Sequence, residues 1–358
     1  MNVAAATPPL TEHLPPRGPH LGLRWFGAGL GAVSVVAVIG IAFGPVRIAP
    51  GAVLLELFDH VPGLDIDSGL SAPAQAIVWD LRAPRVALGL LVGAMLAGSG
   101  ATYQGVFRNP LADPYLLGVA AGAGLGATVA IVNDLGDGVG LTDAVPMFAF
   151  AGALVAVLAS ATLAAPRRHA TSTTALVLAG VAIASFLTAV QTYVQQRDTE
   201  DLRKVYTWIL GRLSTSTWSE VQLIAPYAVV CGIAMVLLAG PLDVLAVGEE
   251  EAATLGVRPA RVRVVALAAA SLAAAAAVSV SGLIAFVGIV VPHAVRRVAG
   301  VSHRRVVPLS MLFGGAFLAG ADIVARTLRS PAELPIGVVT AFIGAPFFLQ
   351  ILRRQAAL

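Results

Sequence analysis

Charged residues are scarce in this chain. Asp, Glu, Lys and Arg together make up 12% of the 358 residues, hydrophobic residues make up 57%, and the mean hydropathy is +0.84. A soluble domain carries roughly 25% charged residues, so this composition excludes an ordinary soluble protein. The apolar runs are continuous and not alternating, which excludes a membrane-spanning barrel of strands. We therefore expect an all-α, polytopic integral membrane protein.

Cysteine and lysine are nearly absent. Cys231 is the only cysteine, which excludes a disulfide bond within the chain and argues against a thiolate metal cluster. Lys204 is the only lysine and it follows Arg203, so the chain has no G-x-x-x-x-G-K-[ST] loop with which to bind ATP phosphates. If ATP drives this protein, the ATPase is a separate chain.

Catalytic and metal-binding side chains do not converge in the sequence. His293 lies in an apolar segment with no second His, Cys or carboxylate spaced to join it, so a structural hydrogen bond explains it better than a metal or haem ligand. Asp322 and Arg326 form the one clear charge pair inside an apolar segment, and a secondary transporter needs more buried acids than this. The sequence predicts no catalytic residue, no metal site and no cofactor bound by this chain. A secondary transporter is kept as an alternative to a transporter driven by a separate ATPase.

Ten apolar segments are candidates for transmembrane helices, each of which needs about 20 mostly apolar residues. They lie at 24–43, 82–106, 114–133, 144–165, 172–195, 221–240, 259–281, 283–299, 306–328 and 336–352. The N-terminal residues 1–23 contain five prolines and no apolar run, which predicts a disordered cytoplasmic tail. The remainder, 24–354, is predicted to be a single transmembrane domain.

The positions of the arginines indicate the topology. With both termini in the cytoplasm, 14 of the 23 basic residues lie inside, as the positive-inside rule requires. The acidic loop 133–143 then lies outside. The outer side nevertheless carries six clustered basic residues, and this exception suggests a role beyond topology. They are Arg82, Arg85, Arg197, Arg203, Lys204 and Arg212.

Three stretches carry more specific patterns. The stretch from Gln104 to Pro114 reads QGVFRNPLADP, and its prolines break the helix there. The stretch 240–263 reads GPLDVLAVGEEEAATLGVRPARVR, which predicts two short helical pieces closed by Gly256 and Pro259. The stretch 282–346 contains GLIAFVGIVVPHAVRRVAG and ELPIGVVTAFIGAP, where prolines and glycines interrupt membrane-length apolar segments.

Together these stretches resemble the FecCD-type permeases, the family that carries iron–siderophores, haem and vitamin B12 through ABC importers. The resemblance runs from about Ala49 to Arg354. It implies a type II ABC importer architecture in the bacterial cytoplasmic membrane, with two permeases, two ATPase subunits that hold the ATP, and an extracytoplasmic substrate-binding protein. A homodimer of permeases is the default and a heterodimer the alternative. Iron–siderophore or haem is the favoured substrate, cobalamin the alternative, and no nucleic acid is involved.

The resemblance also implies roles for particular residues. Those matching the cytoplasmic gate are Asn109, Leu111, Thr173 and Thr174. Those matching the segment that couples the permease to the ATPase, within about 241–258, are Gly248, Glu249, Ala252, Leu255 and Gly256. Those matching basic residues that face acidic groups of the binding protein are Arg82, Arg85 and Arg326. Alternatives remain: the threonines suit a helix N-cap, Arg82 and Arg85 suit membrane-interface anchors, and Arg326 lies four residues after Asp322, which suits an internal ion pair.

Overall fold

The structure is a computed structural model that describes residues 20–44, 46–61, 63–64, 66–135, 143–164, 173–197, 201–330 and 332–356. Every regular element in these ranges is helical, so the predicted all-α fold is confirmed. The elements are α1 (His20–Ala42), α2 (Pro50–Asp59), α3 (Ala72–Ala76), the π-helical turn η1 (Ile77–Arg82), α4 (Ala83–Phe107), α5 (Val119–Val132), α6 (Ala144–Ala164), α7 (Thr173–Arg197), α8 (Leu202–Ile209), α9 (Trp218–Val247), α10 (Glu249–Thr254), α11 (Pro259–Ser281), α12 (Val287–Ala299), α13 (His303–Thr327) and α14 (Ile336–Ala356).

Each of the ten predicted apolar segments corresponds to one helix, but these helices differ in length. In the described residues, seven helical runs are long and apolar enough to cross a membrane, and α5 and α14 are apolar but shorter. The thirteen residues of α12 rise only about 20 Å. Residues 20–23, which we assigned to a disordered tail, form the first turn of α1, and the rest of that tail lies outside the described residues.

Two helices start later than predicted. Helix α5 begins at Val119 and not near 114, because Gly118 has a left-handed backbone (φ 81°) directly before it. Between α11 and α12 the chain leaves the helical conformation, with left-handed Gly282 (φ 69°) and Phe286 (φ 70°). A side chain at Gly282 would collide with the carbonyl oxygen of Trp208, so only glycine fits there. Such irregular backbone is tolerated at membrane depth where it is buried in protein.

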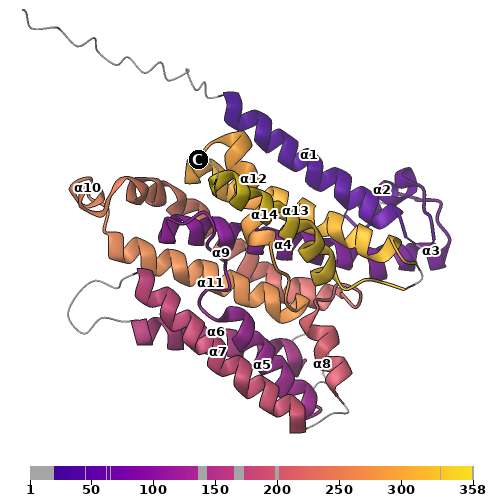
Figure 1. Cartoon of the computed structure of the whole chain (residues 1–358). Helices are drawn as coiled ribbons and strands as arrows, with labels where there is room; N and C mark the ends of the chain where they lie inside the picture. The colour runs from indigo at the N-terminus through magenta and orange to yellow at the C-terminus, as the bar shows by residue number, and fades with distance from the viewer. Residues whose placement is uncertain are drawn as a thin grey trace, which may run out of the picture.

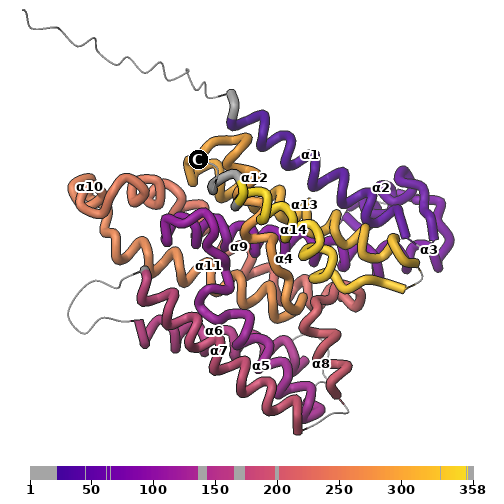
Figure 2. Tube along the Cα trace, in the orientation of Figure 1, coloured from indigo at the N-terminus to yellow at the C-terminus, as the bar shows by residue number. Residues whose placement is uncertain are grey.

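Helix α4 lies at the centre of the bundle. It packs against α9, α11, α12 and α13, while α5, α6 and α7 form a second group that joins the first mainly through α11 (Figure 1). Figure 2 traces the same path. Small residues allow close helix contacts: a side chain at Gly93 would collide with the backbone of Gly314, and one at Gly100 with that of Gly288. Close backbone approach of this kind is how helices associate where lipid gives no hydrophobic drive.

The short elements gather at the two ends of the bundle. Helix α10 and both ends of the described chain lie at one end in Figure 1, and α2, α3 and α8 lie toward the other. We call these the α10 end and the α2 end. At the α2 end, the ring of His60 stacks on Trp79 at 3.7 Å, and Trp79 contacts Trp218 at 4.9 Å. The two ends therefore offer different surfaces, separated by the long helices.

Candidate functional site

The predicted coupling segment forms a short helix that stands out from the α10 end. Helix α10 follows α9 after Gly248 and ends at Leu255. Left-handed Gly256 (φ 80°) closes it, with its N–H donating to the carbonyl of Ala253 and the N–H of Val257 donating to that of Ala252, each at 3.0 Å. This is a Schellman motif. Pro259 then starts α11. Of the two short helical pieces predicted for 240–263, the second is α10, whereas the first is wrong, because residues 240–247 continue the long helix α9.

The side chains of the coupling segment divide between core and solvent. Leu255 is 69% exposed, whereas Ala252 is fully buried and packs in a cluster with Val106, Leu242, Leu245 and Ala266. We expected Ala252 and Leu255 to share the partner-facing surface. The structure corrects this, because Ala252 anchors α10 to α4, α9 and α11. Glu249 forms an ion pair with Arg263 of α11, and this pair fixes the start of α10.

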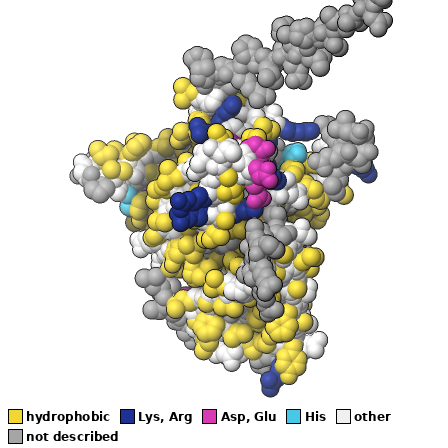
Figure 3. All heavy atoms as spheres, turned by 90° about the vertical axis from the view of Figure 1, so that its left-hand side faces the viewer, with side chains coloured by type: hydrophobic (Ala, Val, Ile, Leu, Met, Phe, Trp, Pro, Cys, Tyr) yellow, Lys and Arg dark blue, Asp and Glu magenta, His cyan; other side chains and the backbone are white. Residues whose placement is uncertain are grey.

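The exposed surface of α10 is acidic. Its first turn carries Glu249, Glu250 and Glu251, all exposed. Figure 3 faces this side of the molecule and shows acidic side chains close to basic ones above a broad hydrophobic area. The α10 end therefore carries charges of both signs on its surface.

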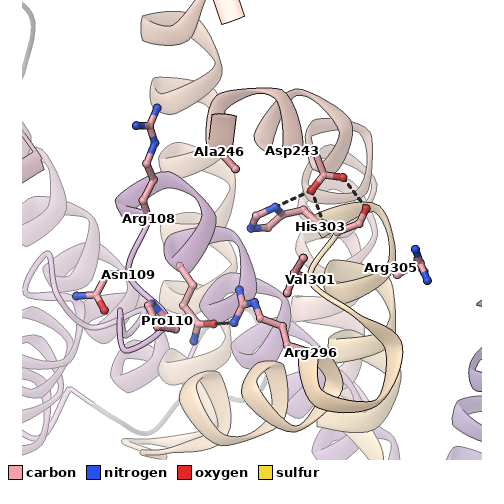
Figure 4. Close-up of a pocket in the computed structure, with 11 residues that line it drawn as sticks. Arg108, Asn109, Pro110, Asp243, Ala246, Arg296, Val301, His303 and Arg305 are labelled. Carbon is pink, nitrogen blue, oxygen red and sulfur yellow. Dashed lines mark hydrogen bonds and ion pairs between the residues drawn. The ribbon is translucent and has the colours of Figure 1, made fainter. Parts of the chain in front are cut away.

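A pocket of about 520 Å³ lies beside the coupling segment. It is bounded by the last turns of α4, α9 and α12 and by the first turn of α13 (Figure 4). Its lining residues are Gln104, Arg108, Asn109, Pro110, Asp243, Ala246, Arg296, Val301, Ser302, His303 and Arg305. Ala246 lies on the last turn of α9, and α10 starts at Glu249. The end of α9 therefore belongs both to the pocket and to the coupling segment.

The predicted gate residues are only partly brought together. Asn109 lines the pocket, where its Oδ1 accepts the N–H of Leu111 at 2.9 Å, and Leu111 is half-buried. Thr173 and exposed Thr174 begin α7, which packs against α5 and α6. Within the described residues the two gate elements therefore belong to different parts of the bundle, and their shared role stays a prediction.

Asp243 connects the end of α9, which leads into α10, to the start of α13. Its carboxylate, on α9, accepts the hydroxyl of Ser302 at 2.6 Å, the backbone N–H of His303 at 2.5 Å and the Nδ1 of His303 at 2.9 Å. Asp243 thereby satisfies the first N–H groups of α13 from another helix, as an N-cap side chain normally does within one helix. The end of α9 is therefore hydrogen-bonded to the start of α13.

The three predicted docking arginines meet inside the bundle near the α2 end. Arg85 pairs with Asp322 at 2.8 Å and with Glu333 at 2.9 Å. Arg82 donates to the carbonyl oxygens of Ile41, Ala42 and Val46 at 2.8, 3.1 and 2.5 Å. Arg326 donates to the carbonyl of Gly40 and lies 3.8 Å from Asp322.

These contacts correct the expectation that the three side chains are presented to a partner. Arg82, Arg85 and Arg326 are 6, 9 and 4% exposed. Our alternative for Arg326, an internal ion pair with Asp322, is present in the structure. Asp322 nevertheless lies closer to Arg85 than to Arg326. Sequence reasoning missed Glu333 altogether, because it lies 248 residues from Arg85 along the chain.

Exposed basic residues do lie at the α2 end, on α8. Arg203, Lys204 and Arg212 line a second pocket of about 400 Å³ together with Asp143 and Trp208. Lys204 contacts Asp201 at 2.6 Å, and the hydrogen bond and charge of Asp201 raise its pKa. Arg203 and Lys204 are exposed, as docking to an acidic surface requires, whereas Arg212 is half-buried and lies 3.7 Å from Glu220.

Comparison with known proteins gives consistent matches. Residues 32–354 match the model of the FecCD transport family. The chain is 45% identical over 287 residues to the cobalamin import system permease protein BtuC of Halobacterium salinarum, covering 80% of this chain and 76% of that protein. It is 34% identical to the Fe(3+)-citrate import system permease protein YfmE of Bacillus subtilis, covering 90% and 92%.

A solved structure agrees with these matches. It is described as the inward-facing conformation of a metal-chelate type ABC transporter, and it superposes with a TM-score of 0.75 at 29% identity, covering 93% of this chain and 99% of the other. The helical bundle, the short helix after α9 and the family match over most of the chain agree with one another. The chain belongs to the FecCD transport family and is a permease of the ABC importer type.

Proposed function

We propose that this permease imports a large metal chelate with energy from a separate ATPase chain that seats on α10. The observation that carries this proposal is the geometry of the coupling segment. Its helix is closed by Gly256 and fixed to the bundle through buried Ala252, and it presents Leu255 outward. An exposed apolar side chain on a rigidly held helix suits insertion into a groove of a partner.

The proposed assembly places the α10 end in the cytoplasm. Two copies of the permease, two ATPase subunits and an extracytoplasmic binding protein complete the importer, with the binding protein at the α2 end. The positive-inside count supports this orientation. Exposed Arg203 and Lys204 are better candidates than buried Arg82 and Arg326 for contacts with acidic groups of the binding protein.

For the substrate we propose cobalamin ahead of an iron chelate. From sequence alone we favoured iron–siderophore or haem. The relative named as a cobalamin permease is 45% identical to this chain, and the relative named for Fe(3+)-citrate is 34% identical. Similar substrates select similar linings of a translocation path, so the higher identity supports cobalamin.

The substrate proposal can be tested by competition in proteoliposomes. The permease is reconstituted with its cognate ATPase and binding protein, and ATP-dependent uptake of radiolabelled cyanocobalamin is measured. Excess unlabelled cyanocobalamin should suppress uptake at least tenfold, and excess ferric siderophore or haem should leave it within about twofold. Uptake of labelled ferric siderophore or haem with none of cobalamin would reverse the order of the two candidates.

A further inference from the structure

The side chain of Arg296 is directed into the pocket at the α10 end. It lies on the last turn of α12, is half-buried, and donates to Oε1 of Gln104 (Figure 4). The amide nitrogen of Gln104 donates to the carbonyl of Gly288 at 3.0 Å and toward that of Ala112 at 3.4 Å. Since both those acceptors need an N–H group, they fix Oε1 on the side of Arg296. The guanidinium is therefore held in one orientation.

Arg296 is not neutralised by the described part of the chain. Its acceptor Gln104 is uncharged, and in the described residues no carboxylate oxygen lies within 4.0 Å of its nitrogens. The one acidic residue of the pocket, Asp243, already accepts three hydrogen bonds from Ser302 and His303. A guanidinium has five N–H donors, and those of Arg296 that Gln104 does not use can face an incoming acceptor.

Basic residues outnumber acidic ones in the pocket. Arg108 and Arg305 line it together with Arg296, against the single carboxylate of Asp243. Positive residues are expected at a cytoplasmic membrane surface, and the next residue, Arg297, meets that expectation because it is exposed to solvent and does not line the pocket. Topology alone gives no reason to turn Arg296 inward and orient it on an amide.

We propose that this pocket receives an acidic side chain of the ATPase subunit. The proposal rests on the proposed function, because it requires an ATPase seated on α10. Ala246 of the pocket lies on the last turn of α9, directly before α10, so a partner seated on α10 would lie next to the pocket. The planar fork of Arg296 matches a carboxylate in a bidentate pair.

The two sites would fix the register of the partner. The first turn of α10 is acidic with Glu249, Glu250 and Glu251, and the neighbouring pocket is basic. A partner with the complementary order of charges binds in one orientation, and a shifted partner places like charges together, which costs several kcal/mol. The apolar contact of Leu255 supplies affinity, and the pocket supplies orientation.

The test compares three variants in the full permease: Arg296→Gln, Arg296→Lys and the matched control Arg297→Gln, which removes the same charge from the adjacent residue. Binding of the purified cognate ATPase to immobilised permease is measured by surface plasmon resonance at two chloride concentrations. We expect Arg296→Gln to weaken binding roughly tenfold or more and to flatten the salt dependence. Arg296→Lys should recover part of the loss, and Arg297→Gln should stay within about twofold of the unchanged protein.

Two further measurements keep the outcome decisive. Thermal unfolding of each variant in detergent shows whether Arg296→Gln folds, and a photo-cross-linking residue at exposed Val301 in the pocket should capture a peptide of the ATPase that contains Asp or Glu. Normal ATPase binding by Arg296→Gln overturns the proposal. If that variant also loses binding of inorganic phosphate while its affinity for the ATPase is unchanged, the pocket is assigned to a free anion and not to the ATPase. If Leu255→Asp still releases the ATPase in those cases, the proposed function stands and only the pocket assignment fails.

Discussion

Arg85→Glu should prevent stable folding of this permease. The substitution replaces a buried cation by an anion beside Asp322 and Glu333, which Arg85 contacts at 2.8 and 2.9 Å. Breaking a buried ion pair by removing one partner costs about 3–5 kcal/mol, and the reversal adds repulsion between carboxylates. A domain is stable by only about 5–15 kcal/mol. The measurement is fluorescence-detected size-exclusion chromatography of membrane extracts after heating, in which the variant should lose its monodisperse peak.

Two controls separate folding from docking. Arg203→Glu reverses an exposed charge at the same end of the bundle and should leave the peak unchanged. The double variant Arg85→Gln with Asp322→Asn removes both charges of the 2.8 Å pair and also takes Asp322 away from Arg326. It should recover part of the stability that Arg85→Gln alone loses. If Arg85→Glu melts like the unchanged protein and only binds the binding protein more weakly, Arg85 is a docking residue, and the buried ion pair matters little for stability.

Leu255→Asp should abolish stimulated ATP hydrolysis while leaving the permease folded. Leu255 is 69% exposed after the last residue of α10, so the free protein should tolerate the charge. In the complex the carboxylate would be buried in an apolar contact, where loss of a central residue costs 2 kcal/mol or more, about 30-fold in affinity. Hydrolysis by the reconstituted complex, with and without loaded binding protein, is the measurement.

Cysteine cross-linking gives the spatial control for Leu255. In a Cys231→Ser background, Leu255→Cys should cross-link to the ATPase, whereas Ala252→Cys should not, because Ala252 is fully buried against α4, α9 and α11. Transport that continues normally in Leu255→Asp, with no cross-link at position 255, would remove α10 from the ATPase interface.

The approximate positions of the long helices could be predicted from the sequence, because spanning a membrane depends on composition and length within one segment. The starts of α5 and α12 could not. The non-helical backbone before them is held by distant partners: the hydroxyl of Tyr115 donates to the carbonyl of Ile284 at 2.9 Å, and Gln104 bonds to Gly288. Such partners lie about 170 residues or more away in sequence, beyond any local pattern.

The segments that form the candidate site could be predicted from the sequence, but which of their side chains are buried and which are exposed could not. The sequence of α10 contains its own stop signals, Gly256 and Pro259, so its bounds follow locally. Which face of α10 is buried depends on Val106, Leu242 and Ala266, and whether Arg85 is exposed depends on Asp322 and Glu333. Charged residues near a segment end read as interface anchors or docking residues until their partners are known.

The central claim is that this permease couples ATP hydrolysis on a partner chain to the import of a metal chelate. The most direct measurement is uptake of labelled chelate into proteoliposomes that contain the permease, with its ATPase, ATP and the binding protein each present or omitted. We predict uptake only when all three are present, and none with a proton gradient alone. Robust uptake driven by a proton gradient in vesicles that lack the ATPase would contradict the account.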